Sequence, residues 1–265
     1  MNLPEFTFED LISPMRTEVF DNSVKGIKPM VFRANSFKKS LFGGIITWQQ
    51  FSDYINNDRA VAGLQVIKPD QTKLCMEKNN LHRDTRPSWG KKDRYEKKYV
   101  HELWNSGSSI ILTKASMLSP NLSAVANAIE QHYKHRTAAD AHLYCSPNAD
   151  AKSFPCHADM DDNYLVHAIG DVHWKVYNTF VKHTVDEKGR KVFEGRMILS
   201  KEEEAQLTPI IDTVLTVGDL LYIPAGMFHT AVPAGPRISI SVPVFESRRE
   251  YPLDRNYYDF TKNIS

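Results

Sequence analysis

The sequence predicts a mainly β fold with flanking helices, built around an antiparallel barrel or jelly roll. Its second half carries short apolar runs divided by turn residues, at about 164–169, 172–179, 213–217, 220–223 and 238–244. Such spacing is typical of antiparallel strands. The first half mixes helical and strand patterns, so we expect its helices to pack on the β core. A chain of 265 residues, 42% of them hydrophobic, can bury a full core as one large domain.

The elements of the first half follow from local signals. Thr47 and Gln50 have the spacing of a capping box, which predicts a helix beginning at Trp48. Apolar residues recur at helical spacing from Leu122 onward. The expected elements are short helices within 5–20, a strand at 28–33, a helix at 48–55, a strand at 109–113, a helix at 122–133 and a strand at 141–145.

Three regions are expected. Residues 1–135 form a mixed α/β region on the core, 136–246 form the β core, and 247–265 form a short tail. Within the first region, residues 68–98 hold ten Lys or Arg and five Asp or Glu, a net charge of +5. This basic segment is either a flap that faces the substrate or a solvated loop.

Composition narrows the function classes. The net charge of +1 gives no sign of a nucleic-acid or membrane partner. Three scattered cysteines indicate a reducing compartment, so we expect a cytoplasmic protein. The first residues are too polar for a signal peptide, and no apolar run is long enough to span a membrane.

Two motifs together predict a metal site. The first is His157-Ala-Asp159, and the second runs from Gly218-Asp219 to His229. Positions i and i+2 of a strand share a face, so His157 and Asp159 project together. Two imidazoles and one carboxylate on one face of an octahedral ion leave the other face open, as ferrous iron needs to bind a co-substrate and dioxygen. The simpler alternative is an ordinary histidine in a surface loop.

These motifs resemble the Jumonji-C hydroxylases of the cupin superfamily, most of all the ribosomal oxygenases. The resemblance spans most of the chain. It is carried by Lys28-Pro29, Trp48-Gln-Gln-Phe51, Leu118-Ser-Pro120, Leu143-Tyr144-Cys-Ser-Pro147, Gly170-Asp-Val-His-Trp174-Lys-Val-Tyr177 and 218–229.

The resemblance implies a double-stranded β-helix. It also implies ferrous iron held by His157, Asp159 and His229, with 2-oxoglutarate as co-substrate. The implied reaction hydroxylates a protein side chain, such as one of a ribosomal protein, and releases succinate and carbon dioxide.

One departure concerns the co-substrate anchor. The family usually has Lys or Arg fifteen positions after the first ligand, where this chain has Val172. Lys175 falls on the opposite strand face. We expect Arg237 to grip the far carboxylate bidentately with help from Ser239, an Arg-x-Ser placement similar to that of other 2-oxoglutarate oxygenases. The alternative is that Arg237 lies on the surface.

Other pocket residues are suggested by the resemblance. Tyr144 matches a tyrosine that contacts the co-substrate, and Asn163 an asparagine near the open metal positions. His142 and His167 stand where ribosomal oxygenases usually have Asn and Gln, and each either lines the pocket or is a buried core histidine. We expect His173 and Trp174 to serve packing.

Two rival functions remain open. Val172 allows a metal-dependent cupin enzyme that does not use 2-oxoglutarate, and the basic segment allows a non-catalytic binding module. We expect a protein or peptide substrate, with a small molecule as the alternative. Ribosomal oxygenases usually continue into dimerisation and winged-helix regions, whereas few residues follow 246 here. The oligomeric state and a ribosomal substrate are therefore left open.

Overall fold

The computed structural model describes residues 6–56, 64–71, 73–74, 81–83, 93–95, 97–133, 139–151, 154–187, 191–244 and 255–259. Much of the basic segment 68–98 lies outside these ranges, so its role as flap or loop stays untested. The helices are α1 (Phe8–Ile12), α2 (Thr17–Ser23), α3 (Ser36–Gly43), α4 (Trp48–Asn56), α5 (Lys97–Asn105), α6 (Pro120–His132) and α7 (Lys201–Glu204), with a 3-10 turn at Ala115–Leu118.

Sixteen strands are named in the described ranges. The first eight are β1 (Met30–Phe32), β2 (Leu64–Ile67), β3 (Lys73–Leu74), β4 (Leu81–Arg83), β5 (Asp93–Tyr95), β6 (Ser109–Leu112), β7 (His142–Ser146) and β8 (His157–Ala158). The others are β9 (Asp162–Ile169), β10 (Val172–Phe180), β11 (Lys182–Val185), β12 (Lys191–Glu194), β13 (Pro209–Leu215), β14 (Leu220–Ile223), β15 (Met227–Pro233) and β16 (Arg237–Val244).

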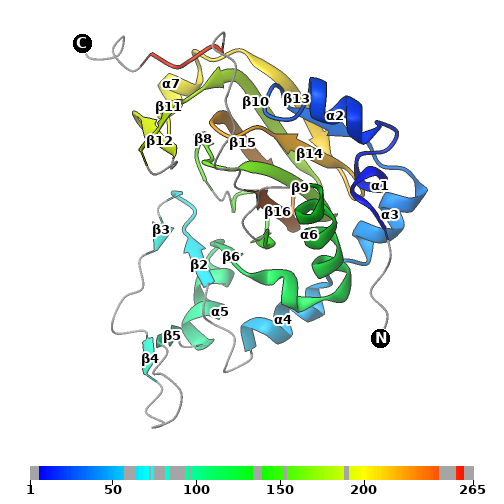
Figure 1. Cartoon of the computed structure of the whole chain (residues 1–265). Coiled ribbons are helices and arrows are strands. Elements are labelled where there is room, and N and C mark those ends of the chain that lie inside the picture. Colours follow the sequence, from blue (N-terminus) through cyan, green and yellow to red (C-terminus); the bar gives the residue numbers. More distant parts are fainter. Residues whose placement is uncertain are drawn as a thin grey trace.

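Two antiparallel sheets form the core of the fold (Figure 1). The larger has the order β1-β14-β9-β16-β7-β6-β2-β3, and the smaller has the order β13-β10-β15-β8. Strands β7, β9, β14 and β16 lie in the larger sheet, and β8, β10, β13 and β15 form the smaller one, so successive strands cross from sheet to sheet except between β10 and β13. This alternation gives a jelly-roll core. The predicted mainly β jelly roll is confirmed. Strands β1, β2, β3 and β6, from before residue 136, extend the larger sheet at both edges.

Strand β16 shows how the fold positions a polar site. Its residues Ile238, Ile240 and Val242 belong to the apolar core that also contains side chains of α1, α3 and α6. The alternate residues Arg237 and Ser239 therefore point into the barrel. A second apolar cluster, which includes Val172 and Val176 of β10, fills part of that interior.

The capping box that the sequence predicts at Thr47 and Gln50 is present. The Gln50 backbone N–H donates to Thr47 Oγ1 at 3.1 Å, and the Thr47 N–H donates to Gln50 Oε1 at 2.8 Å. This reciprocal pair satisfies donors that the helix itself leaves without partners. Ser119 caps α6 in a similar way, accepting from the Leu122 N–H at 3.1 Å.

Gly170 forms the tight turn between β9 and β10. Its φ of +75° is a conformation that side chains rarely adopt, and an added Cβ would lie 2.3 Å from the Pro236 carbonyl oxygen. The glycine therefore lets the start of β16, with Arg237, approach this turn closely.

A buried acid ties the barrel to the N-terminal region. Asp162, 1% exposed, accepts hydrogen bonds from Tyr222 Oη at 2.8 Å and from the Ala225 N–H at 2.9 Å. Tyr222 Oη in turn accepts from the Gly26 N–H at 2.6 Å. No sequence motif had pointed to this network.

The cysteines and the helices can be compared with what the composition suggested. Cys145 and Cys156 are buried free thiols. Within the described ranges, no helix combines the length and the apolar character that crossing a membrane requires.

Candidate metal centre

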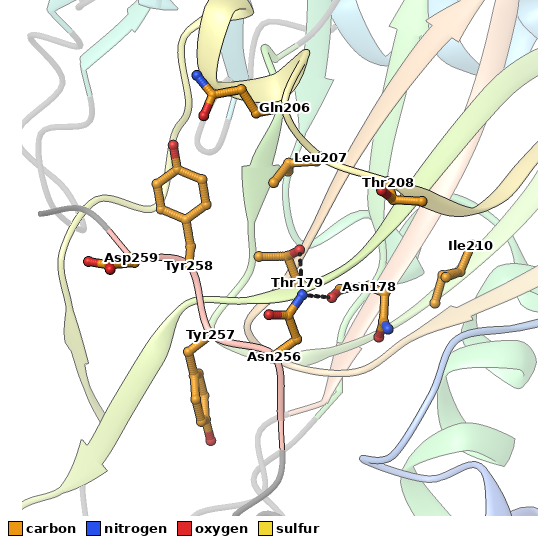
Figure 2. A pocket seen from close by; sticks show the side chains of 10 residues that line it. All are labelled: Asn178, Thr179, Gln206, Leu207, Thr208, Ile210, Asn256, Tyr257, Tyr258 and Asp259. Carbon is orange, nitrogen blue, oxygen red and sulfur yellow. Dashed lines mark hydrogen bonds between the residues drawn. The ribbon is translucent and has the colours of Figure 1, made fainter. Parts of the chain in front are cut away.

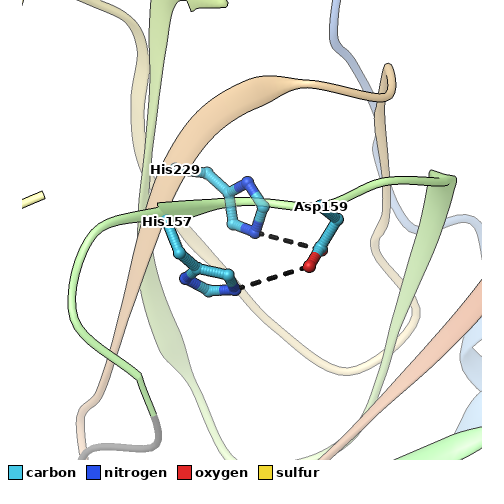
Figure 3. Close-up of side chains that lie close together, drawn as sticks. All are labelled: His157, Asp159 and His229. Atoms are coloured by element: carbon cyan, nitrogen blue, oxygen red, sulfur yellow. Dashed lines mark ion pairs between the residues drawn. The ribbon is translucent and has the colours of Figure 1, made fainter. Parts of the chain in front are cut away.

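The side chains of His157, Asp159 and His229 point toward one another and form a compact cluster (Figure 3). His157 of β8 and His229 of β15 are direct partners in the ladder between these strands. Asp159 follows the last residue of β8. One ligand atom from each of the three residues lies within 4.8 Å of the other two. The carboxylate oxygens of Asp159 lie 3.8 Å from His157 Nε2 and 3.5 Å from His229 Nε2.

Backbone carbonyls fix the orientation of both imidazoles. His157 Nδ1 lies 2.8 Å from the Pro155 carbonyl oxygen, and His229 Nδ1 lies 3.0 Å from that of Met227. A carbonyl oxygen can only accept, so each Nδ1 carries the proton. In the neutral form of either ring, Nε2 then presents a lone pair toward Asp159, which is the arrangement of a histidine that binds a metal.

Burial keeps His229 in its ligand form. Desolvation, followed by the nearby His157, lowers the pKa of His229 to about 4. The imidazole is therefore neutral near pH 7. The side chain of His157 is 20% exposed and that of Asp159 is 36% exposed, so the cluster is open on one side.

Two polar residues hold the Asp159 carboxylate in place. Asn163 Nδ2 donates to Asp159 Oδ2 at 2.5 Å, and Ser241 Oγ donates to Asn163 Oδ1 at 2.5 Å. Asn163 lines the cavity beside the cluster, and its amide also orients the ligand carboxylate. That second contact could not be seen from the sequence.

A cavity extends from the cluster into the barrel. Its lining includes the three cluster residues and the predicted co-substrate residues Tyr144, Asn163, Arg237 and Ser239, together with Phe154, Leu165, Trp174, Ala231 and Ser241. His142 and His167 are not among the lining residues. His142 is half-buried, whereas His167 is completely buried.

Arg237 is a buried cation inside the barrel. It is 2% exposed, so the alternative of a surface arginine is wrong. Its Nε donates to Ser146 Oγ at 3.1 Å, and its Nη1 lies 3.5 Å from Ser239 Oγ. Burial lowers its pKa to about 10, which leaves it protonated near pH 7. A guanidinium held in this way can bind a carboxylate that enters the cavity.

Val172 and Lys175 lie on opposite faces of β10, as the sequence predicts. Val172 is fully buried in the apolar cluster of the barrel. The Lys175 side chain is 39% exposed and lies 3.9 Å from Asp212 on the outer face. Neither residue supplies a charge to the cavity.

Two aromatic expectations have different outcomes. Trp174 is buried, but besides packing it donates from Nε1 to His167 Nε2 at 3.0 Å. The expectation that His173 packs is wrong, because its side chain is 41% exposed and contacts Asp212 at 2.5 Å. The strand period places His173 on the outer face with Lys175.

A larger cavity, of about 430 Å³, shares no lining residue with the cavity beside the cluster (Figure 2). It is formed by the end of β10, the segment after α7 and residues 256–259, and its lining contains no histidine and one carboxylate, Asp259. Asn256 Nδ2 is bonded to the Asn178 carbonyl at 2.6 Å. The grouping of ligand atoms, rather than cavity size, therefore marks the functional site.

Comparison with known families decides the assignment. A model described as "JmjC domain" matches residues 114–250, which is 137 of the 265 residues. The chain belongs to the JmjC family. The matched JmjC region contains all three residues of the cluster as well as Arg237 and Ser239. The family predicted from the sequence is confirmed.

Relatives of this JmjC chain are named as oxygenases and demethylases. It is 27% identical over 224 residues to Ribosomal oxygenase 1 of Danio rerio, covering 84% of this chain and 37% of the relative. It is 27% identical over 129 residues to the bifunctional lysine-specific demethylase and histidyl-hydroxylase NO66 of Drosophila grimshawi, covering 49% and 16%. The chain thus spans well under half the length of these relatives.

Solved structures share the fold. The ribosomal oxygenase YcfD of Escherichia coli aligns with a TM-score of 0.57 at 16% identity, over 88% of this chain and 53% of that one. YcfD in complex with cobalt and 2-oxoglutarate aligns with a TM-score of 0.56 at 16% identity, over 88% and 52%.

Proposed function

We propose that this JmjC protein is an Fe(II)- and 2-oxoglutarate-dependent oxygenase that hydroxylates a protein side chain and releases succinate and carbon dioxide. One observation carries the proposal: an open His-Asp-His cluster shares a cavity with a buried arginine. The cluster suits a divalent ion, and the arginine suits the far end of a dicarboxylate.

The residues present fit the metal. His157, Asp159 and His229 would hold it, since two Nε2 atoms and one carboxylate form the facial set that ferrous oxygenases use. The ion would supply the binding and activation of dioxygen together with the co-substrate. Asn163 holds the ligand carboxylate, and the apolar side chains of Leu165, Trp174 and Ala231 line the cavity and limit the entry of water.

Arg237 and Ser239 are proposed to bind the far carboxylate of 2-oxoglutarate. They begin β16, whose partner strand β7 places Tyr144 opposite Ser239. Burial raises the pKa of Tyr144 above its ordinary value, so its hydroxyl stays protonated and can donate to an acidic ligand. In this proposal Arg237 on β16 takes the place of the cation that the family usually carries fifteen positions after the first ligand, where this chain has Val172 on β10.

The substrate class follows from the relatives' names and is part of the proposal. Ribosomal oxygenase 1 and NO66 are named for action on ribosomes, lysine and histidine residues. We therefore propose a protein or peptide substrate, with ribosomal proteins as the first to test. The two buried free thiols support a cytoplasmic location.

The test is an anaerobic titration. Purified protein is loaded with ferrous iron, 2-oxoglutarate is added, and the visible charge-transfer band of the chelate is recorded. We expect the band in the wild type and its loss in His157→Ala and Asp159→Ala, with circular dichroism showing that both variants stay folded. His173→Ala, on the outer face of β10, is the matched control.

The outcomes separate the rival functions. Iron binding without a band would favour a cupin enzyme that does not use 2-oxoglutarate. A band with wild-type strength in both ligand variants would overturn the assignment of the cluster. With the band established, ribosomal proteins incubated with the enzyme, iron and 2-oxoglutarate should gain one oxygen atom by mass spectrometry.

A further inference from the structure

A hydrogen-bonded chain links Trp174 to the proposed carboxylate site. Trp174 Nε1 lies 3.0 Å from His167 Nε2. An indole N–H can only donate, so His167 Nε2 must accept, and a neutral His167 carries its proton on Nδ1. One contact therefore determines the tautomer of a fully buried histidine.

The next link is the hydroxyl of Ser239. His167 Nδ1 lies 3.5 Å from Ser239 Oγ, and Arg237 Nη1 also lies 3.5 Å from the same oxygen. Both neighbours are donors, so both lone pairs of the hydroxyl face an N–H group. The single hydrogen of Ser239 is thereby directed to a third partner. Ser239 lines the cavity together with Arg237, so this hydrogen is available to a ligand within the cavity.

A neutral His167 is consistent with these hydrogen bonds. Burial, followed by the neighbouring positive charge of Arg237, lowers the pKa of His167 to about 3, while Asp219 acts weakly in the opposite direction. The imidazole is therefore neutral under physiological conditions, as the tautomer argument requires.

We propose that Trp174 and His167 are positioning residues that make Ser239 a hydrogen-bond donor toward the cavity. Ser239 and Arg237 then both present donors to the far end of the cavity. A carboxylate, which only accepts, satisfies such a site, whereas a carboxamide would bring its own N–H groups against donors. The hydrogen-bonded series from Trp174 through His167 to Ser239 thus favours a dicarboxylate co-substrate over its monoamide. This inference rests on the proposed function.

The first test addresses the tautomer without any ligand. Protein labelled with ¹⁵N at histidine is studied by long-range ¹H–¹⁵N correlation NMR near pH 7. We expect the His167 signals of the Nδ1–H tautomer in the wild type and a mixture of tautomers in Trp174→Phe, which removes the indole donor. An Nε2–H tautomer in the wild type would overturn the proposal.

The second test is a double-mutant cycle on 2-oxoglutarate affinity. Binding is measured by anaerobic calorimetry with Mn(II)-loaded protein, which does not turn over. His167→Phe should weaken binding by about tenfold, the usual effect of losing a hydrogen bond to a charged group. His167→Gln, whose amide can accept from Trp174 and donate to Ser239, should restore most of the affinity.

The decisive comparison is made in the Ser239→Ala background. If His167 acts through the hydroxyl, His167→Phe has no further effect on affinity there. If the losses of 2-oxoglutarate affinity add in the double variant, His167 acts by packing alone, and the proposed hydrogen-bonded link through Ser239 is wrong. Should His167→Phe fail to fold, Trp174→Phe takes its place in the cycle.

The proposed function and this inference fail in different ways. If the wild type binds no 2-oxoglutarate, the proposed function is wrong, and the NMR experiment still decides the tautomer. If the wild type binds it but discriminates poorly against 2-oxoglutaramate, the selection argument is wrong. A preference for the dicarboxylate that Trp174→Phe reduces would support it.

Discussion

Replacing Arg237 by Gln should separate co-substrate binding from protein stability. The arginine is 2% exposed, so water cannot take over its role. Removing one partner of a buried ion pair typically costs about 3–5 kcal/mol, because the other charge is left without compensation. With about 1.4 kcal/mol for each factor of ten, 2-oxoglutarate affinity should fall at least about a hundredfold.

Although Arg237→Gln should lower 2-oxoglutarate affinity, it should not lower the stability of the fold. In the free protein the cation is buried at a cost, which is why its pKa falls from its ordinary value to about 10. That difference corresponds to roughly 3 kcal/mol against the charged form. The shorter Gln side chain removes this cost and loses some packing, so Arg237→Gln should unfold at a denaturant concentration no lower than the wild type.

The assay is anaerobic calorimetry of 2-oxoglutarate binding to metal-loaded protein, with denaturant unfolding run on the same samples. Lys175→Ala is the matched control, because it removes a cation from the outer face of β10. Its affinity should equal that of the wild type. Equal losses in the two variants, or wild-type affinity in Arg237→Gln, would refute the placement of the carboxylate.

Three further outcomes are expected. Asn163→Ala should lower metal affinity about 10–100-fold, measured by competition with a chelator, since the amide orients the ligand carboxylate. Gly170→Ala should destabilise the fold by about 2 kcal/mol or more in denaturant unfolding, because its Cβ would meet a carbonyl oxygen; Gly235→Ala, with no atom within 4 Å of its Cβ, should be neutral. His167→Gln should change the acid sensitivity of stability. The folded-state pKa of His167 is depressed to about 3, so its stabilising contribution is present above pH 6.5 and is lost as pH falls toward 3. Between pH 7 and pH 4.5 the wild type should therefore lose about 2.5 kcal/mol more than the variant, and equal losses would contradict the assigned pKa.

Strand periodicity explains why much of the site could be predicted. Alternation along β16 placed Arg237 and Ser239 on one face and isoleucines on the other, and the structure turns the apolar face toward the helices. The same rule separated Val172 from Lys175. Strand alternation explains the metal cluster less completely. The strand β8 ends at Ala158, and Asp159 follows it, held by Asn163.

The contacts that were missed join residues distant in sequence. Asp162 and Tyr222 meet only because β9 pairs with β14, and neither has a distinctive local motif. Trp174 meets His167 across the turn at Gly170, and a tryptophan in an apolar run gives no sign of which acceptor it will find. His173 shows the converse error, since an aromatic ring in a strand was expected to be buried and is not.

The pairing of β8 with β15 has a consequence for folding. His157 and His229 are 72 positions apart in sequence (229 − 157) and occupy one rung of the ladder. An ion bound to both would therefore act as a cross-link that closes a long loop, and it would bind the folded chain but not the unfolded one. At a hundred times its dissociation constant such an ion adds about 2.7 kcal/mol to the free energy of unfolding. The concentration of available metal would then set the stability of the fold as well as the activity of the site.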